Sequence, residues 1–152
     1  MKFNCIVPDF LFLGSAILEL NVDNKLSMVP EDLIRKFGMD IIFSELTAEE
    51  KTWTGKLLLK ILIELEQNDK KVCSIDMTLE GAFSSPLSVD EQKFKELVLI
   101  NGAAALFSVA RAKIENISAT MFASGKIVLP FVNIYDYYEE KNKKNKAPII
   151  KN

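Results

Sequence analysis

The chain opens on two apolar stretches that predict strands joined by a long connection. Residues 10–20 and residues 37–46 are rich in apolar side chains and are bounded by polar residues typical of turns, although the period of residues 10–20 is ambiguous on its own. Residues 21–36 between them contain asparagine, proline and mixed charges without steady periodicity, which indicates a crossover connection. Ordered connections of this length in a small domain are often functional.

The next two stretches show the period of two that extended chains have. Residues 71–83 alternate cleanly between apolar and polar side chains, which predicts a strand with one buried and one solvated face. Residues 52–65 carry apolar side chains on both faces, because Leu58 and Leu62 lie opposite the main apolar series. A strand of this kind is rarely left open to water. Short polar turns join the last three strands, so we expect them to form an antiparallel meander.

The period changes to three and four after residue 88, which predicts helices. Ser88 to Glu91 reads as a capping box, and Asn101 with Gly102 marks a natural stop or kink. A stronger stripe follows and ends at Ser124 and Gly125, which should cap a helix of about 20 residues. The apolar residues of that stripe recur every three or four positions: Ala103, Leu106, Phe107, Ala110, Ile114, Ile117 and Met121.

A shorter helix is expected to open at Leu129 and Pro130, because proline suits the first position of a helix. Lysines dominate the chain beyond it. We therefore expect a single domain over residues 1–140 and a basic, disordered tail over residues 141–152. The predicted fold class is α+β: a four-stranded antiparallel sheet covered by one long helix, with a shorter C-terminal helix.

Three short motifs, taken in order, resemble the SecB family of export chaperones. Leu106 to Arg111 is similar to the Leu-Phe-Pro-Tyr-Ala-Arg motif in the long helix of that family, and Leu129 to Ile134 is similar to the motif that opens its second helix. Glu80 to Phe83 is similar to the segment that closes its last strand. Ser108 and Phe131 depart from the pattern, because the family often has proline at both positions. The resemblance covers roughly residues 9–140 and implies a SecB-like fold.

Composition narrows the classes of partner. The formal net charge of the 152 residues is only -2, so neither nucleic acid nor an anionic membrane is expected as the main partner. Apolar residues make up 49%, which is high for a small domain and suggests surface buried against other copies or clients. Cys5 and Cys73 lack metal-site spacing and should be small buried residues in a reducing compartment. No run of 18 apolar residues and no clean signal-peptide core is present, so we expect a cytoplasmic protein.

The sequence favours a protein without catalytic activity. It contains no histidine, which removes the histidine-based nucleophilic arrangements and the commonest metal ligand. Asp76 and Glu80 lie four residues apart on one strand face, roughly 13 Å, which is too far to share a proton. Their ordinary interpretation is a solvated strand face, and the functional one is docking of a partner. We expect no metal and no cofactor.

The resemblance also implies a groove that holds extended, unfolded polypeptide. Aromatic and methionine side chains suit such a surface, because they offer large contact areas and adaptable packing. Each of these residues singly is better explained by the core or a subunit interface, and they support a binding surface only as a group. Arg111 lies in the helix motif; its charge is explained either by an exposed or snorkelling side chain or by a structural ion pair, which we prefer to a binding role. The residues expected to line the groove are Met28, Val29, Phe37, Phe122, Ile127, Phe131 and Tyr135.

Three hypotheses for function follow from these observations. The first is a SecB-like chaperone of protein export that holds unfolded polypeptide clients without nucleotide hydrolysis. The second is a dedicated adaptor of the same fold that serves one partner, such as a toxin–antitoxin or secretion component. The third is a small enzyme or ligand-binding protein that shares only the α+β outline. The family assembles through its edge strand and long helix, so we expect a homodimer or homotetramer. Coupling to the SecA motor is the family property that this lysine-ended chain supports least.

Overall fold

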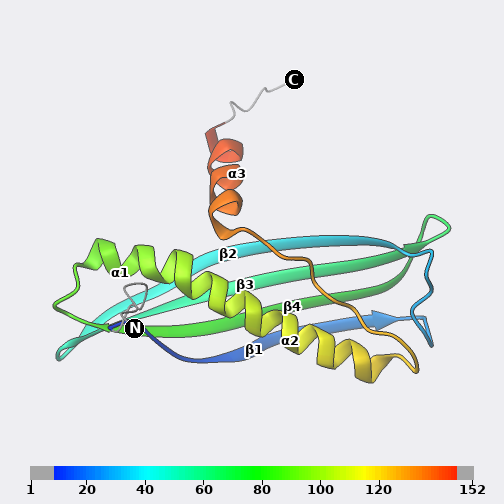
Figure 1. The fold of residues 1–152 in the computed structure, drawn as a ribbon, viewed down its shortest axis with the longest axis horizontal. Helices are drawn as coiled ribbons and strands as arrows, with labels where there is room; N and C mark the ends of the chain where they lie inside the picture. Colours follow the sequence, from blue (N-terminus) through cyan, green and yellow to red (C-terminus); the bar gives the residue numbers. More distant parts are fainter. Residues whose placement is uncertain (1–8, 147–152) are drawn as a thin grey trace, which may run out of the picture.

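The computed structural model describes residues 9–146 and contains one antiparallel sheet (Figure 1). The strand order is β1-β4-β3-β2, so the three later strands form the predicted meander and β1 lies beside β4. Asn68 and Asp69 both adopt positive φ angles, which suit the two-residue hairpin between β3 and β4. The strands are β1 (Leu11–Asn24), β2 (Ile34–Glu49), β3 (Thr52–Gln67) and β4 (Lys70–Pro86).

The crossover is shorter than predicted, because both flanking strands are longer. β1 continues to Asn24, which pairs with Cys73, so the polar residues from Asn21 onward alternate along a strand instead of forming a turn. The Asn24 side chain ends this strand by accepting from the Leu26 amide at 3.0 Å and donating to the Leu26 carbonyl at 2.9 Å. We call residues 25–33 the crossover.

One face of the sheet forms the core. The alternating residues of β3 and β4 that face the helix are fully buried, including Leu57, Ile63, Ile75 and Leu79. Cys73 is buried among them as expected, and Cys5 lies outside the described residues. The opposite face carries charged residues joined in pairs, such as Lys56 with Glu45 at 2.8 Å. This division confirms the one-sided alternation predicted for β4.

A single helical stretch crosses the buried face diagonally, made of α1 (Glu91–Leu97), a π-helical turn η1 (Val98–Gly102) and α2 (Ala103–Met121) (Figure 1). Its N-terminus is capped by Asp90, whose Oδ2 accepts from the amides of Gln92 at 3.0 Å and Lys93 at 3.2 Å. The expected capping box from Ser88 is therefore wrong, because the Asp90 carboxylate already serves these first-turn amides. Its length and mean hydropathy of 1.5 would also suit a membrane span, but its apolar side packs on the sheet.

Gly102 kinks this helix without stopping it. A Cβ atom at Gly102 would lie 3.0 Å from the Phe83 ring, so the glycine lets the helix approach the sheet closely. The backbone accommodates the approach through the π-helical turn, a feature found as a single wider turn inside α-helices.

α2 ends at Met121, three residues before the predicted cap. Phe122 is extended, with φ −104° and ψ 141°, and Ser124 forms a parallel bridge with Met28 of the crossover. The Ala123 amide donates to the Ser27 carbonyl at 2.8 Å. Pairing with the crossover therefore takes the place of the glycine cap, although Gly125 does adopt a positive φ of 86°.

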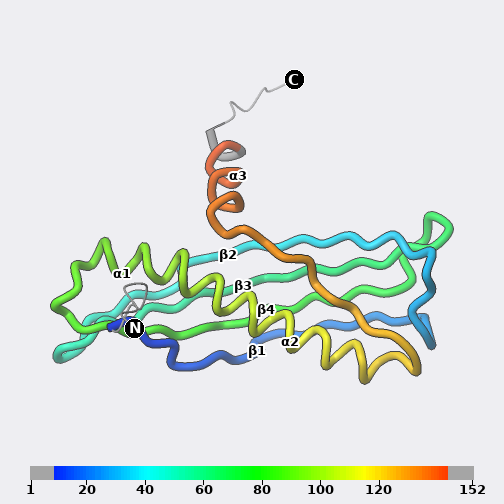
Figure 2. The backbone as a smooth tube through the Cα atoms, in the orientation of Figure 1, coloured from blue at the N-terminus to red at the C-terminus, as the bar shows by residue number. Residues whose placement is uncertain are grey.

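An extended segment, residues 122–133, runs back over the helix side of the sheet and leads to α3 (Ile134–Lys146), which projects beyond the β2 edge (Figure 2). We call residues 122–133 the linker. The helix does not open at Leu129 and Pro130 as predicted, because Asn133 caps it by accepting from the Tyr135 amide at 3.0 Å. α3 continues to Lys146, past residue 141 where we expected the tail to begin. Residues 147–152 of that tail lie outside the described residues.

Candidate functional site

A hollow of about 180 Å³ lies where β2, α2 and the linker meet. Its lining side chains are all apolar, so it offers contact area without polar groups that would select one small ligand. The size is below the roughly 300 to 1,000 Å³ of small-molecule sites. The lining residues are Phe37, Gly38 and Met39 of β2, Ile61 of β3, Phe107 of α2, and Leu129, Pro130 and Val132 of the linker.

The register of β2 directs its side chains toward this hollow. Phe37 pairs with Ile63 and Met39 with Ile61, so both side chains lie on the sheet face that the helix covers. At this edge the helix no longer covers them fully, and Phe37 remains 39% exposed. β2 therefore presents apolar side chains that belong to the core face but are open to solvent.

Arg111 of α2 holds the linker in place. Its Nε donates to the Leu129 carbonyl at 3.2 Å, and its guanidinium lies 4.2 Å from the centroid of the Phe131 ring. The expected structural ion pair is not formed, since none of the ion pairs among residues 9–146 involves Arg111. The cation instead stacks on an aromatic ring that is 89% exposed. Phe131 thus stands beside the hollow as an open aromatic surface.

Two of the residues expected to line the groove belong to the core instead. Phe122 is 5% exposed and Ile127 is 1% exposed. The Ile127 amide donates to the buried Ser118 hydroxyl at 2.8 Å, which satisfies this part of the linker backbone inside the protein. Neither side chain is available to a ligand in this structure.

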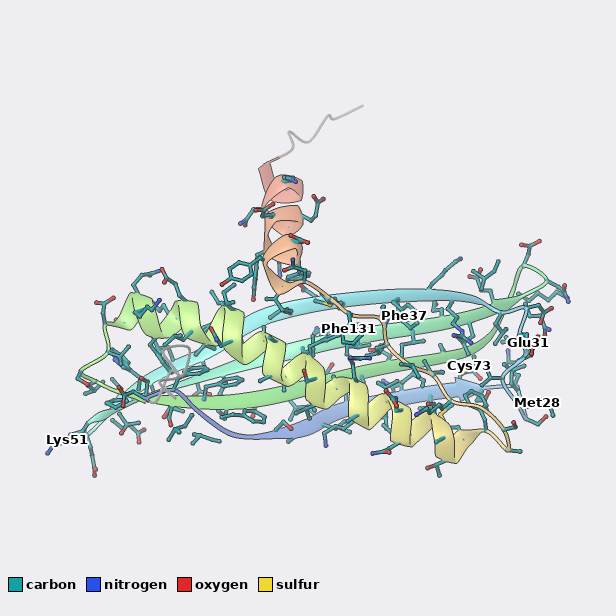
Figure 3. All side chains as sticks on the ribbon, viewed as in Figure 1. Met28, Glu31, Phe37, Lys51, Cys73 and Phe131 are labelled. Atoms are coloured by element: carbon teal, nitrogen blue, oxygen red, sulfur yellow. The ribbon has the colours of Figure 1, made fainter. Side chains whose placement is uncertain are left out.

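The crossover residues lie in a different place. Met28 is 56% exposed, whereas Val29 is half-buried and its amide donates to the Ser124 carbonyl at 3.2 Å. Figure 3 shows Met28 at the end of the sheet where β1 and β2 are joined, with Phe37 and Phe131 nearer its middle. The predicted residues therefore do not form one continuous groove.

Tyr135 lines a separate depression of about 250 Å³ at the start of α3, together with Leu97, Ile100 and polar residues of the long helix. Its side chain is 65% exposed. Of the predicted residues, only Phe37 lines the hollow itself, and Phe131 flanks it on the linker.

Four groups form a polar cluster where α3 meets the edge of β2: the Asp40 carboxylate, the Ile41 backbone, the Tyr137 hydroxyl and the Lys141 ammonium. We call this the Asp40 cluster. Tyr137 donates to Asp40 Oδ1 at 2.7 Å, and Lys141 donates to the same oxygen at 2.6 Å. The Ile41 amide donates to the Tyr137 hydroxyl at 2.9 Å, and Lys141 donates to the Ile41 carbonyl at 2.8 Å.

The pKa values in the Asp40 cluster follow from these bonds. Burial alone would raise the pKa of Asp40, but the hydrogen bonds from Lys141 and Tyr137 outweigh it and hold the pKa below its ordinary value. Burial likewise opposes the charge on Lys141, yet its bond to Asp40 raises the pKa of the ammonium. Burial and the Asp40 carboxylate raise the pKa of Tyr137. All three groups therefore keep their ordinary charges near neutral pH.

Asp76 and Glu80 lie on β4 on the face away from the helix, opposite Leu62 and Leu58 of β3. Asp76 is exposed and Glu80 half-exposed. This placement agrees with a solvated strand face, and docking of a partner there remains a prediction. Residues 9–146 hold no group of three or more cysteine, aspartate and glutamate side chains arranged for a metal ion.

Most of the hollow was missed from the sequence. Phe107 was expected in the apolar stripe of the long helix and Val132 in the second helix motif, whereas Met39 and Ile61 were not singled out within their predicted strands. The usable signal was the alternation of Phe37, Met39, Ile41 and Phe43 on a strand beside a crossover. That alternation indicates an apolar face, but it does not show which end of the face the helix leaves open.

Comparison with known proteins identifies the fold. The SecB-like chaperone Rv1957 from Mycobacterium tuberculosis, solved in complex with a ChAD peptide from the HigA1 antitoxin, is similar to this chain with a TM-score of 0.65. The two sequences are 12% identical, and the similarity covers 82% of this chain and 91% of that one. A protein of unknown function from Streptococcus agalactiae is similar with a TM-score of 0.51 and 11% identity, over 81% of this chain and 98% of that one.

No protein-family model and no curated protein sequence matches this chain. At identities near 12%, the structural likeness shows the fold alone. The chain has a SecB-like fold: a four-stranded antiparallel sheet, a long helix across one face and a shorter C-terminal helix. The fold predicted from the three motifs is confirmed.

Proposed function

We propose that this protein is a molecular chaperone that binds unfolded or export-bound polypeptides through apolar contacts around the hollow, without nucleotide hydrolysis. The observation that carries the proposal is the open apolar surface at the β2 edge, where Phe37 lines the hollow and Phe131 stands 89% exposed beside it. Exposed aromatic groups gathered in one place are a common mark of a binding surface. The M. tuberculosis protein of the same fold is described with a bound peptide, which supports polypeptide as the class of ligand.

The surface suits extended, apolar and varied sequences. One aromatic client side chain that buries about 150 Å² would contribute roughly 4 kcal/mol before the costs of association. That energy alone corresponds to millimolar affinity. A client must therefore engage several sites at once, along one subunit or across an assembly.

A variant of Phe37 tests the proposal. Replacing Phe37 by serine, alone and together with Met28, should reduce capture of a chemically denatured model protein by several-fold, because each change removes exposed apolar surface. The unfolding temperature should change little, since neither side chain is buried. The measurement is light scattering during dilution from denaturant, without nucleotide, and moderate salt should have little effect.

Leu87→Ser provides the matched control. The exposed fraction of Leu87 is 38%, nearly the same as the 39% of Phe37, but Leu87 lies in the turn after β4. Equal loss of capture in the Phe37 and Leu87 variants would show that the hollow is not the binding site for denatured protein. A large fall in unfolding temperature for Phe37→Ser would instead assign that residue to the core.

A dedicated adaptor is the second candidate, favoured by one observation: the peptide in the similar M. tuberculosis structure comes from one antitoxin. An adaptor of this kind would protect one partner and leave unrelated proteins to aggregate. Failure of the unmodified protein to protect several unrelated denatured substrates would favour the adaptor over the general chaperone.

We also propose that the protein works in the cytoplasm as a homodimer or homotetramer. The support for assembly is the solvent-open edge strand β1, whose large apolar residues are at least 36% exposed from Leu11 to Val22. If the protein couples to the SecA motor, we propose that the face carrying Asp76 and Glu80 is the docking surface.

A further inference from the structure

The free edge of β2 is closed at one residue by side chains of α3. The Ile41 amide donates to Tyr137, and the Ile41 carbonyl accepts from Lys141. In an antiparallel ladder the N–H and C=O of one residue point to the same side, so both Ile41 groups point away from β3. Tyr137 and Lys141 thus occupy the two hydrogen-bonding positions that the backbone of a neighbouring strand would fill.

The same side of β2 is open before Ile41. No register shift separates Arg35 from Ile41, so the backbone groups of Arg35, Phe37 and Met39 also point away from β3. None of the described residues donates to or accepts from these groups of Phe37 or Met39 on that side. Residues 34–38 are all exposed. We call residues 34–39 the open edge.

The open edge is regular, unlike the other edge of the sheet. β1 is interrupted by bulges between Phe12 and Gly14 and between Ile17 and Glu19, whereas β2 pairs without a shift until Phe43. Bulges disturb the addition of a further strand. The β2 edge can therefore accept an extended chain with regular backbone hydrogen bonds.

The hollow lies directly beside the open edge, because Phe37, Gly38 and Met39 belong to both. A strand paired with β2 would direct every second side chain to the helix side, toward Phe107 and Leu129. Backbone pairing combined with pockets for alternate side chains is the pattern of recognition by strand addition.

We propose that an extended client segment adds antiparallel to the open edge as a fifth strand, places alternate side chains against the hollow, and is stopped at Ile41 by α3. This inference rests on the proposed function, because it names how the same site holds its polypeptide. Paired backbone groups at Arg35, Phe37 and Met39 supply hydrogen bonds that do not depend on client sequence. They add to the apolar contacts, which are too weak alone.

A single strand fits this edge better than a second copy of the protein. α3 contacts Ile41 through Tyr137 and Lys141 and projects past β2 (Figure 2), and its 13 residues span roughly 20 Å. A folded sheet continuing from β2 would meet this helix, whereas one added strand needs only about 5 Å beside β2.

Backbone N-methylation of a probe peptide tests the proposal. The probe is a short synthetic peptide of alternating valine and threonine with a lysine at each end, labelled for fluorescence anisotropy. In an antiparallel pair, directly opposite residues share a face, so the valines that face the hollow point their amides at β2. Methylation of the valine amides should weaken binding at least about tenfold, while methylation of the threonine amides should leave it nearly unchanged.

Equal affinity of the two methylated peptides would overturn strand addition while leaving apolar capture by the hollow intact. Absence of binding by the unmethylated peptide, together with failure to prevent aggregation, would overturn the proposed function as well. The two failures are thus distinguishable.

Amide hydrogen exchange measured by NMR gives a second readout. Binding of the unmethylated probe should slow exchange at Phe37 and Met39 and leave Gly38 unchanged, because Gly38 already faces β3. In the variant Tyr137→Phe with Lys141→Met, protection by the probe should extend to Ile41. The control pair Tyr135→Phe with Lys143→Met removes the Lys143–Glu140 ion pair within α3 but keeps the bonds of Tyr137 and Lys141 to Ile41, and should show no such extension. Uniform protection across residues 35–41, or none at all, would overturn the proposal.

Discussion

Arg111 shows how one side chain can serve both the fold and the site. Its hydrogen bond to Leu129 ties the linker to α2, and its guanidinium supports the exposed Phe131 ring. A lysine at this position would keep the charge but lose the planar group that stacks on the ring. Ser108, where the related motif often has proline, hydrogen-bonds to the Ala104 carbonyl at 3.0 Å within the helix. Serine is thus accommodated at this position within the continuous helix α2.

Residue by residue, the sequence predicted apolar character better than exposure. Phe122, Ile127 and Phe131 are all large apolar residues, but the first two are buried and the third is exposed. The Ile127 amide donates a hydrogen bond to the buried Ser118 hydroxyl at 2.8 Å, which draws Ile127 inward, and Arg111 holds Phe131 outward. Both partners lie on α2, 9 and 18 residues before the linker residues they bind, so a local pattern could not reveal these contacts.

The Asp40 cluster should make the free energy of unfolding depend on pH in the acidic range. The folded-state pKa of Asp40 lies below its ordinary value of 3.8, so the unfolded chain binds more protons as the pH falls through that region. The cluster's contribution is therefore present above about pH 4 and is lost at lower pH. We expect it to be below about 1 kcal/mol, because the Asp40 side chain is 49% exposed.

Thermal unfolding between about pH 5 and pH 3 measures this contribution. Asp40→Asn should lower the unfolding temperature at the higher pH and show a smaller further fall on acidification than the unmodified protein. Asp76→Asn is the control, since Asp76 forms no ion pair among the described residues. Identical pH profiles for Asp40→Asn and the unmodified protein would contradict the role of Asp40.

At the scale of elements, strands were predicted more accurately than helix ends. The alternation along β3 and β4 identifies both strands because it reports burial directly. The helix ends depended on tertiary partners: α2 stops where the chain pairs with the crossover, and α3 begins where Asn133 can cap it. Proline at position 130 suited a helix start by local rules but lies in the linker instead.

The close approach of the helix to the sheet requires glycine at position 102, in the π-helical turn, and this requirement can be tested. Alanine there gains up to about 1 kcal/mol of helix propensity but drives a methyl group to 3.0 Å from Phe83. Phe83 is fully buried and stacks on Phe10 with ring centroids 5.6 Å apart, so it has little room to move. Overpacking costs typically 1 to 3 kcal/mol, so we expect Gly102→Ala to destabilise by about 1 kcal/mol.

Chemical denaturation compares this variant with Gly38→Ala. A Cβ at Gly38 would meet only Leu62 at an ordinary 3.8 Å, so that change should be tolerated. A stabilised Gly102→Ala protein would show that the helix can move away from the sheet, and the close approach would lose its structural importance.

For the whole molecule, the two free edges of the sheet have different expected roles. The β1 edge exposes large apolar side chains, which suit side-chain packing against another subunit, while its two bulges disfavour continuous backbone pairing there. The β2 edge carries the hollow, the open edge and α3. Assembly and client binding can therefore occur at opposite sides of one subunit.

Sedimentation at micromolar concentration tests the assembly. We expect a homodimer or homotetramer, and Leu18→Glu should shift it toward monomer because Leu18 is 54% exposed on β1. Leu87→Glu, outside β1, should leave the mass unchanged. A monomeric unmodified protein would count against assembly through this edge.

Site-specific photocrosslinking tests the central claim most directly. A benzoylphenylalanine residue placed at position 37 or 131 should crosslink to a denatured model protein without nucleotide, whereas the same residue at position 87 should not. Crosslinking at positions 37 and 131 should also decline when an unlabelled apolar peptide is added in excess. Equal crosslinking at all three positions, or none at positions 37 and 131, would contradict polypeptide binding at the hollow.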